Sequence, residues 1–397
     1  LLPFGRLADI YGRKKIFSLG ILFFLLGSLA AALSRSGAML LAARVIQGLG
    51  GGLVFGTATA ILISVYPPEK RGHVIGWNIA AVYIGLSLGP PAGGWMVGQF
   101  GWRSIFWLNS ILCAVVLWLT LRYLRREWKE AAGEKFDAPG AAAYALGIVA
   151  LMYGLSTLPA SRGYAALAAA AAALGLFIHW EGRTSTPLLE VRLLRGNRVF
   201  AFSNLAALIS YSATFAVGFL LSLYLQYIKG LTPQQAGLVM ISQPVMQALF
   251  SPVAGRLSDR IEPRLIASAG MALTAAGLAL LFFLERTTGV AYISLSLVVL
   301  GIGFGLFSSP NTNAIMGAVE RRQFSVASAT LATMRMLGQM FSMGMTALVI
   351  ALFVGHRQIG AENQGGFLDG MHLLLGGFAL LSLAGIFASL ARGKVHR

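Results

Sequence analysis

The sequence predicts an all-α membrane protein made of two related halves, and three observations support this prediction. Of the 397 residues, 57% are hydrophobic and only 11% are charged, whereas about 25% of the residues in a soluble domain are charged. Apolar runs long enough to cross a bilayer, about 20 residues each, follow one another along the chain. Two short motifs of the first half return in the second half after 250 and 253 positions.

Twelve apolar runs are predicted to span the bilayer as helices, and they divide the chain into three parts. We expect an N-terminal bundle at residues 1–122, a linker with two inserted helices at 123–198, and a C-terminal bundle at 199–397. The predicted spans are residues 16–34, 37–66, 72–98, 102–122, 138–158, 163–181, 199–228, 233–254, 264–284, 289–312, 323–354 and 371–391.

The first residues of the chain, Leu1-Leu2-Pro3-Phe4, are apolar and lack an initiator Met. Such a start is typical of the tail of a helix whose beginning lies upstream. We therefore expect that one complete helix and most of a second one are missing from the N-terminal bundle.

The basic residues predict how the chain is oriented in the membrane. Alternate loops, beginning with the loop around Asp9, hold 23 of the 31 Lys and Arg residues, and the opposite loops hold six. Because cytoplasmic loops are enriched in Lys and Arg, we expect the Asp9 loop and the C-terminus to face the cytoplasm. The net charge of +17 follows from this bias and from attraction to anionic lipid, so it does not indicate a nucleic-acid partner.

Residues suited to metal or redox chemistry are scarce. The only cysteine, Cys113, lies inside an apolar run, and the five histidines are scattered without ligand spacing. These features exclude a disulfide framework and a Cys-based metal site. No phosphate-binding Gly-x-x-x-x-Gly-Lys-Ser/Thr loop is present either.

A charged segment between the first apolar runs carries the first repeated motif. It reads Gly5-Arg6-Leu7-Ala8-Asp9-Ile10-Tyr11-Gly12-Arg13-Lys14-Lys15, and Gly255-Arg256-Leu257-Ser258-Asp259-Arg260 repeats its Gly, Leu and Asp. Gly5 and Gly12 are predicted to permit a tight turn between helices. Asp9 is predicted to pair with Arg13 or with the positive N-terminal end of a neighbouring helix. An ordinary basic turn is the alternative, but it does not explain the repeat.

This segment resembles the cytoplasmic signature of the major facilitator superfamily, a family of membrane carriers, at Gly5, Leu7, Ala8, Asp9, Gly12, Arg13 and Lys14. The resemblance implies the major facilitator fold, in which two six-helix bundles rock about a central compartment. It also implies that the segment is a gating loop that closes one face while the other opens. The residues assigned to this gate are Gly5, Asp9, Gly12, Arg13, Gly255, Asp259 and Arg260.

Arg44 lies roughly 10 Å into the run 37–66. A charge at this depth is costly, so it should face a cavity or a partner. Gln47 lies three residues further, on the same helix face. Arg44-Val45-Ile46-Gln47-Gly48 resembles the Arg-x-x-Gln-Gly motif of the superfamily, whose arginine is implied to assist proton transfer. An arginine that reaches the outer interface is the alternative.

The run 72–98 contains Gly85-Leu86-Ser87-Leu88-Gly89-Pro90-Pro91-Ala92-Gly93-Gly94. Gly85 and Gly89 predict a face that lets another helix backbone approach, and the two prolines predict a bend in the helix. The positions Gly85, Gly89, Pro90, Gly93 and Gly94 resemble the antiporter signature of the superfamily.

The second half carries one deep charge, Arg335, roughly 20 Å into the run 323–354. We expect it to meet a carboxylate, backbone carbonyls or cavity water, and a purely structural role is the alternative. All fourteen acidic residues lie in loops or at the ends of runs, so the buried carboxylate that a proton antiporter needs is not visible. Asp369, near His372, is the one weak candidate for proton coupling, and a solvated loop acid is its alternative.

The two inserted runs in 123–198 resemble those of the fourteen-helix drug:proton antiporters of the superfamily. The leading hypothesis is therefore a multi-pass exporter in the plasma membrane of a prokaryote. It would move small amphiphilic compounds out of the cell in exchange for protons, with the proton gradient and no cofactor as its energy source. The use of a periplasmic adaptor protein stays open.

Two other function classes are considered. A carrier of the same fold with narrow specificity would export one metabolite or antibiotic, or import a solute. A membrane enzyme or sensor is disfavoured, because the sequence has no phosphate-binding loop, no cluster of metal ligands and no soluble domain.

Overall fold

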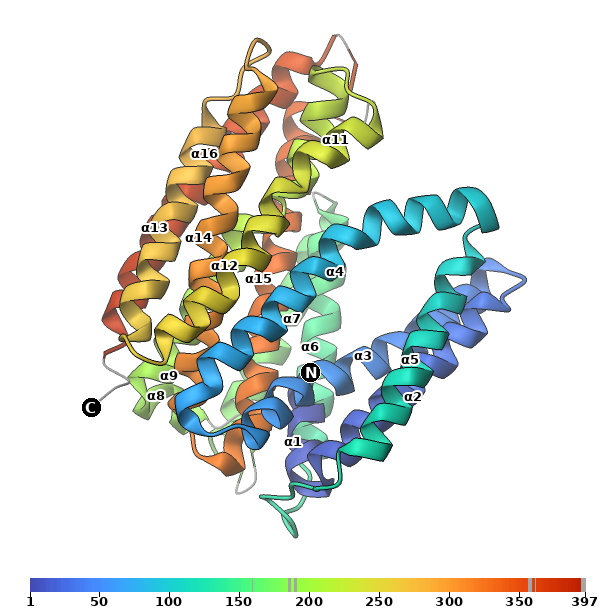
Figure 1. Ribbon diagram of the computed structural model, residues 1–397, viewed down its shortest axis with the longest axis vertical. Helices are drawn as coiled ribbons and strands as arrows, with labels where there is room; N and C mark the ends of the chain where they lie inside the picture. The colour runs from blue at the N-terminus through green and yellow to red at the C-terminus, as the bar shows by residue number, and fades with distance from the viewer. Residues whose placement is uncertain (159, 185–186, 189–190, 356–358, 361, 394–397) are drawn as a thin grey trace.

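The computed structural model confirms an all-helical membrane protein (Figure 1). It describes residues 1–397 except 159, 185–186, 189–190, 356–358, 361 and 394–397, and except the side chains of 90, 91, 191 and 192. Within the described residues every regular element is a helix, and twelve spans are long and apolar enough to cross a membrane. The number of predicted spans is thereby confirmed.

The first half of the chain and the inserted pair form seven helices. A short 3-10 turn, Pro68–Lys70, precedes the fourth of them. The helices are α1 (Leu2–Tyr11), α2 (Arg13–Ala32), α3 (Gly37–Val65), α4 (Arg71–Phe100), α5 (Arg103–Tyr123), α6 (Ala138–Thr157) and α7 (Ser161–Glu181).

The second half contains nine α-helices, of which two pairs form single spans. Arg198–Ile228 is one span made of α9, α10 and a π-helical turn, Tyr224–Ile228, and Pro233–Ser258 is another made of α11 and α12. The helices are α8 (Val191–Gly196), α9 (Arg198–Thr214), α10 (Val217–Leu223), α11 (Pro233–Met240), α12 (Ser242–Ser258), α13 (Pro263–Phe282), α14 (Val290–Gly317), α15 (Phe324–Phe353) and α16 (Gln364–Ala391).

The turn between α1 and α2 is made by one glycine. Gly12 has a φ of 115°, which only glycine adopts readily. Gly5 lies inside α1, so the prediction that both glycines form the turn is wrong for Gly5. The chain stays helical there because Leu7 and Ala8 favour a helix. Gly5 instead permits close packing, since a Cβ at this position would lie 2.6 Å from the Cβ of Ala329 in α15.

Helix α4 crosses from the first half of the chain to the second. It lies along α12, while α2 packs between α3 and α5, and the second half of α4 bends away toward α5 (Figure 1). This bend agrees with the prolines at 90 and 91. Because of it, nothing described lies within 4 Å of a Cβ placed at Gly85, Gly89 or Gly94. The expected close helix approach along this glycine face is therefore not made among the described residues.

The inserted helices α6 and α7 form a hairpin that packs on α15. Gly154 of α6 leaves room for Leu167 of α7, which would lie 2.8 Å from an added Cβ. The Tyr144 hydroxyl lies 3.1 Å from the Thr333 Oγ1 of α15. The first contact closes the hairpin, and the second attaches it to the second half of the protein.

A buried arginine ties the end of α16 to its neighbours. Arg392 donates to the Asn311 Oδ1 of α14 at 2.8 Å and to the carbonyl oxygen of Pro263 at 2.9 Å. Burial lowers the pKa of Arg392 to about 9, so the side chain is still charged at neutral pH. This charge holds three helices of the second half at one end.

Candidate functional site

Asp259, at the end of α12, binds the first turn of α4. Its Oδ1 accepts a hydrogen bond from the Gly72 N–H at 2.8 Å, and its Oδ2 accepts one from the His73 N–H at 2.9 Å. The first N–H groups of a helix have no partner within the helix and carry its positive dipole end. Asp259 therefore links the two halves of the protein through a charge–helix contact.

Burial raises the pKa of the Asp259 carboxyl, and the hydrogen bonds from Gly72 and His73 oppose this rise. Asn313 of α14 also faces the carboxylate, with its Nδ2 3.4 Å from Oδ1. The carboxylate is thus held by groups of both halves.

Two glycines let α4 and α12 touch at this point. A Cβ at Gly255 would collide with the carbonyl oxygen of Gly72, and a Cβ at Gly72 would collide with that of Gly255. One turn further, a Cβ at Gly76 would lie 2.5 Å from the carbonyl oxygen of Ser251. Side chains at these glycines would push the helices apart, so the glycines are required for the contact.

The first copy of the motif makes a matching contact. Asp9 is fully buried and pairs with Arg13, whose Nη2 and Nε lie 2.8 and 3.0 Å from its Oδ1. Arg13 Nε also donates to the Ser325 hydroxyl at 2.9 Å. Arg13 Nη2 also donates to the carbonyl oxygen of Arg321, just before α15.

The two contacts are related by the internal repeat. Asp9 of the first half meets the beginning of α15, and Asp259 of the second half meets the beginning of α4. Helix α15 begins at Phe324, and helix α4 begins at Arg71. We call this pair of contacts the aspartate latch. It joins the halves at the end of the molecule where the basic residues gather.

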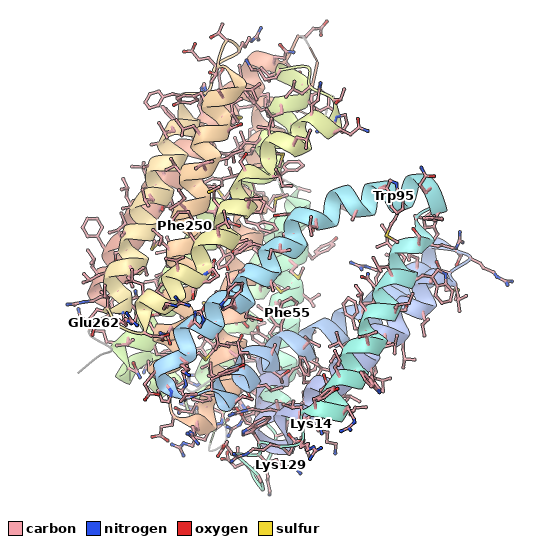
Figure 2. All side chains as sticks on the ribbon, in the orientation of Figure 1. Lys14, Phe55, Trp95, Lys129, Phe250 and Glu262 are labelled. Carbon is pink, nitrogen blue, oxygen red and sulfur yellow. The ribbon has the colours of Figure 1, made fainter. Side chains whose placement is uncertain are left out.

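The linker after α5 reinforces the first half of the latch. Glu127 accepts hydrogen bonds from the N–H groups of Lys14 and Lys15 at 2.9 and 3.1 Å, and so caps α2. The Ala131 N–H donates to the carbonyl oxygen of Asp9, and Arg6 pairs with Glu134. Figure 2 shows Lys14 and Lys129 together at this end. The sequence interpretation missed Glu127, although an acid in a basic linker was a usable signal.

A cluster of aromatic and basic side chains lies between the halves. Phe304 of α14 makes edge-to-face contacts with Tyr83 of α4 and Tyr211 of α9, with ring centroids 5.9 and 5.2 Å away. The Arg335 guanidinium lies 5.5 Å above the Tyr211 ring, and its Nη2 donates to the Thr312 Oγ1 at 3.0 Å. We call these five residues the central cluster.

Arg335 meets an aromatic ring and a hydroxyl, and no ion pair joins it to a carboxylate among the residues that the structure describes. Its Nε is buried without a hydrogen-bond partner. Arg335 can thus donate a further hydrogen bond to a polar or anionic group. Sequence reasoning found Arg335 but not its aromatic neighbours, because aromatic residues are ordinary in an apolar run.

Arg44 and Gln47 are brought together as their spacing predicts. Arg44 Nη1 donates to the Gln47 Oε1 at 2.8 Å, and the Gln47 Nε2 donates to the Ser28 hydroxyl at 2.6 Å. Gln47 is buried and Arg44 is exposed. The chain of hydrogen bonds joins α3 to α2.

The remaining candidates lie apart from these groups. Asp369 is exposed near the start of α16, so it lacks the burial expected of a proton-coupling acid. His372 Nε2 lies 2.7 Å from the carbonyl oxygen of Leu284. A Cβ added at Gly93 would lie 4.0 Å from the Cδ1 of Ile105. The side chain of Pro90 is outside the described residues, and Arg260 is exposed in the turn after α12.

Comparisons with known proteins identify related chains. A family model described as Major Facilitator Superfamily matches residues 1–206 and again 203–396. The riboflavin transporter RibZ of Clostridioides difficile is 30% identical, over 89% of this chain and 76% of its own length. The multidrug resistance protein Stp of Mycobacterium tuberculosis is 32% identical, over 88% of this chain and 66% of its own length.

The solved structure of the human organic anion transporter MFSD10 has a similar fold. The TM-score is 0.69, with 17% sequence identity, and the match covers 98% of this chain and 79% of the human chain. At this identity the likeness concerns the fold alone.

Proposed function

Because the chain belongs to the Major Facilitator Superfamily, and is therefore a transporter and not an enzyme, we propose that it exports amphiphilic compounds in exchange for protons. In this proposal it works in the plasma membrane of a prokaryote and is of the fourteen-helix drug:proton antiporter type. The inserted hairpin of α6 and α7 supports that assignment. The name of the relative Stp, a multidrug resistance protein, supports drug export.

The aspartate latch is the observation that carries this proposal. Asp259 holds the beginning of α4 directly, and Asp9 reaches the beginning of α15 through Arg13, which donates to the Ser325 hydroxyl. Breaking both contacts would let that end open as the halves rotate. Such motion of two repeats about a central site is the basis of alternating access.

The central cluster is the substrate site in this proposal. Tyr83 comes from the first half and Tyr211, Phe304 and Arg335 from the second, so a compound bound there contacts both halves. Aromatic faces accept flat apolar surfaces of many shapes. The guanidinium adds a polar contact that orients the compound.

Proton coupling is assigned to the chain Arg44–Gln47–Ser28. The hydrogen bonds at 2.8 and 2.6 Å would let Arg44 reorganise when a nearby acid gains or loses a proton. Asp369 is kept as a weaker candidate, because its side chain is exposed near the start of α16.

The test is dye efflux driven by a pH gradient, measured with the full-length protein in proteoliposomes. A fluorescent amphiphilic dye should move only while the gradient is present, and a protonophore should stop it. Dye movement that is indifferent to the gradient would reject antiport. An Arg44→Gln variant should lose the dependence on the gradient while its affinity for the dye is unchanged.

A narrow-specificity carrier is the second candidate, and Arg335 favours it. A buried guanidinium nitrogen without a partner suits one defined anionic group better than a range of cations. The name of the relative RibZ, a riboflavin transporter, points in the same direction. Growth-inhibition assays with unrelated toxic compounds separate the candidates, since a multidrug exporter should protect against several of them.

A further inference from the structure

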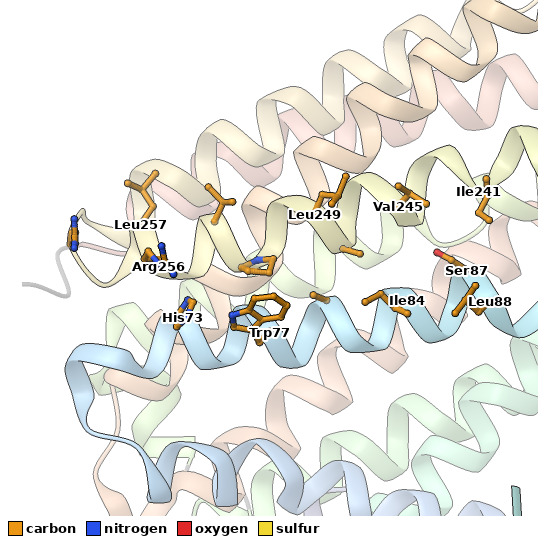
Figure 3. Close-up of a pocket in the computed structure, with 15 residues that line it drawn as sticks. His73, Trp77, Ile84, Ser87, Leu88, Ile241, Val245, Leu249, Arg256 and Leu257 are labelled. Carbon is orange, nitrogen blue, oxygen red and sulfur yellow. The ribbon is translucent and has the colours of Figure 1, made fainter. Parts of the chain in front are cut away.

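A groove runs along the outside of the contact between α4 and α12. It encloses about 720 Å³ and is lined by apolar side chains for most of its length, among them Trp77 and Ile84 of α4 and Leu249 of α12 (Figure 3). Trp77 and Leu249 are each 58% exposed. The groove is therefore open at the surface of the protein, and the residues of the central cluster do not line it.

One end of the groove is positively charged. Arg256, in the last turn of α12, and Arg260, in the turn that follows the helix, line it and are exposed. Figure 3 shows Arg256 beside His73 at this end, with Leu88 and Ile241 at the other. No ion pair joins either arginine to an acid in the part of the chain that the structure describes. The nearby Asp259 is occupied by the beginning of α4.

The charged end lies on the side where basic residues gather, at the end of the span Pro233–Ser258, where a lipid headgroup can reach it. From Ile241 to Arg256 the groove follows roughly 22 Å of helix, which exceeds half of the roughly 30 Å hydrocarbon core. An acyl chain that enters from that leaflet fits this length. Arginine binds phosphate oxygens strongly and with two hydrogen bonds at once.

We propose that this groove binds an anionic phospholipid of the cytoplasmic leaflet. Its phosphate lies between Arg256 and Arg260, and one acyl chain lies along Trp77, Ile84 and Leu249. Charge complementarity selects this occupant over a zwitterionic lipid, which carries its own cation next to the phosphate.

The walls of the groove belong to different halves of the protein. The site is complete only while α4 and α12 touch, which is the state held by the aspartate latch. A ligand that binds one state more tightly shifts the equilibrium toward it. Anionic lipid therefore favours the state that is closed at the basic end. This effect does not depend on which compound is transported or on proton coupling.

The test measures quenching of Trp77 fluorescence by phospholipids with brominated acyl chains. The full chain is reconstituted in nanodiscs, and the signal of Trp77 is the difference between the protein and its Trp77→Phe variant. Brominated phosphatidylglycerol should quench this signal at a mole fraction several-fold lower than brominated phosphatidylcholine does. Equal quenching by both lipids would overturn the proposal.

Two paired variants test the role of the arginines. Arg256→Gln with Arg260→Gln should abolish the preference for phosphatidylglycerol. Arg125→Gln with Arg126→Gln, an exposed basic pair of the linker, should keep it. If the preference survives the first pair of changes, or is lost equally in the second, the site is not built by Arg256 and Arg260. Displacement of the lipid by soluble glycerol phosphate would identify a site for free phosphates and overturn the proposal.

The effect on conformation is tested separately. Spin labels at the exposed positions Lys70 and Ile261 are placed in a Cys113→Ser background. Lys70 precedes α4 and Ile261 follows α12, so the distance between the labels reports how far these two helix ends separate. The short distance should become more populated in phosphatidylglycerol than in phosphatidylcholine, and the Arg256→Gln/Arg260→Gln variant should lose the difference. An unchanged distribution in the unsubstituted protein would overturn the selective stabilisation of the closed state.

Discussion

The two aspartates of the latch occupy equivalent positions but differ in their surroundings. Asp9 is fully buried against the charge of Arg13, whereas Asp259 is partly exposed and bonded to N–H groups of α4. Loss of one partner from a buried ion pair costs about 3–5 kcal/mol, because the other charge is left unpaired. We therefore expect Asp9 to be needed for folding and Asp259 to be needed chiefly for closing the gate.

Asp259→Asn should open the latch without unfolding the protein. The amide keeps one acceptor oxygen but loses the charge, and a hydrogen bond to a charged group contributes about 1.5–3 kcal/mol. The labels at Lys70 and Ile261 should then report a larger population of long distances, at an unchanged melting temperature. Asp9→Asn should instead lower the melting temperature. The opposite pattern would show that Asp259 is needed for folding and Asp9 for closing the gate.

Gly255→Ala should separate α4 from α12, because the new Cβ collides with the carbonyl oxygen of Gly72. We expect the spin-label distance to lengthen and the transport rate to fall several-fold. Gly237→Ala in α11 is the matched control, since nothing described lies within 4 Å of its Cβ. Wild-type closure in Gly255→Ala would show that the backbone contact is not required.

At the scale of the elements, several contacts between distant segments are made at the beginnings of helices. Glu127 caps α2, Asp259 meets α4, and Ser325 in the first turn of α15 bonds Arg13. In each case an acidic or hydroxyl group from a distant segment satisfies N–H groups or charges near a helix end. The linker thus becomes part of the gate and does more than connect α5 to α6.

Glu127→Gln should destabilise the protein modestly. Loss of a capping group costs about 0.5–2 kcal/mol, and this should lower the apparent melting temperature of the purified protein by a few degrees. Glu130→Gln is the control, because Glu130 is exposed in the same linker. Equal effects of both changes would point to the net charge of the linker and not to the cap.

At the scale of the whole molecule, the central cluster exists only because the two halves meet. Tyr83 lies in α4, and the other members lie in α9, α14 and α15. A rotation that separates α4 from α12 would move Tyr83 away from Phe304. Substrate binding and gate closure are therefore expected to be coupled.

Arg335→Gln should reduce the transport rate at least tenfold, which corresponds to a rise of about 1.4 kcal/mol in the free-energy barrier to transport. Arg335→Lys should recover only part of it, since an ammonium cannot replace the planar contact with Tyr211. Initial transport rates at several substrate concentrations provide the measurement. Arg322→Gln, at an exposed surface pair with Glu320, is the control. Wild-type rates for Arg335→Gln would remove it from the substrate site.

The sequence by itself determined the membrane fold, the twelve spans and the repeat that links Asp9 to Asp259. These follow from composition, run length and local motifs, which need no knowledge of distant contacts. It also predicted the Arg44–Gln47 contact, because residues three apart share a helix face.

Only the tertiary structure decided which distant groups meet. It placed Gly5 inside a helix, brought Glu127 to the start of α2, and assembled Tyr83, Phe304 and Arg335 from separate spans. It also left the glycine face of Gly85 and Gly89 without a neighbour, because α4 bends away from the bundle. The physical reason is that a local pattern shows which face of a helix is apolar or small, while the crossing of helices far apart in the chain decides what that face contacts.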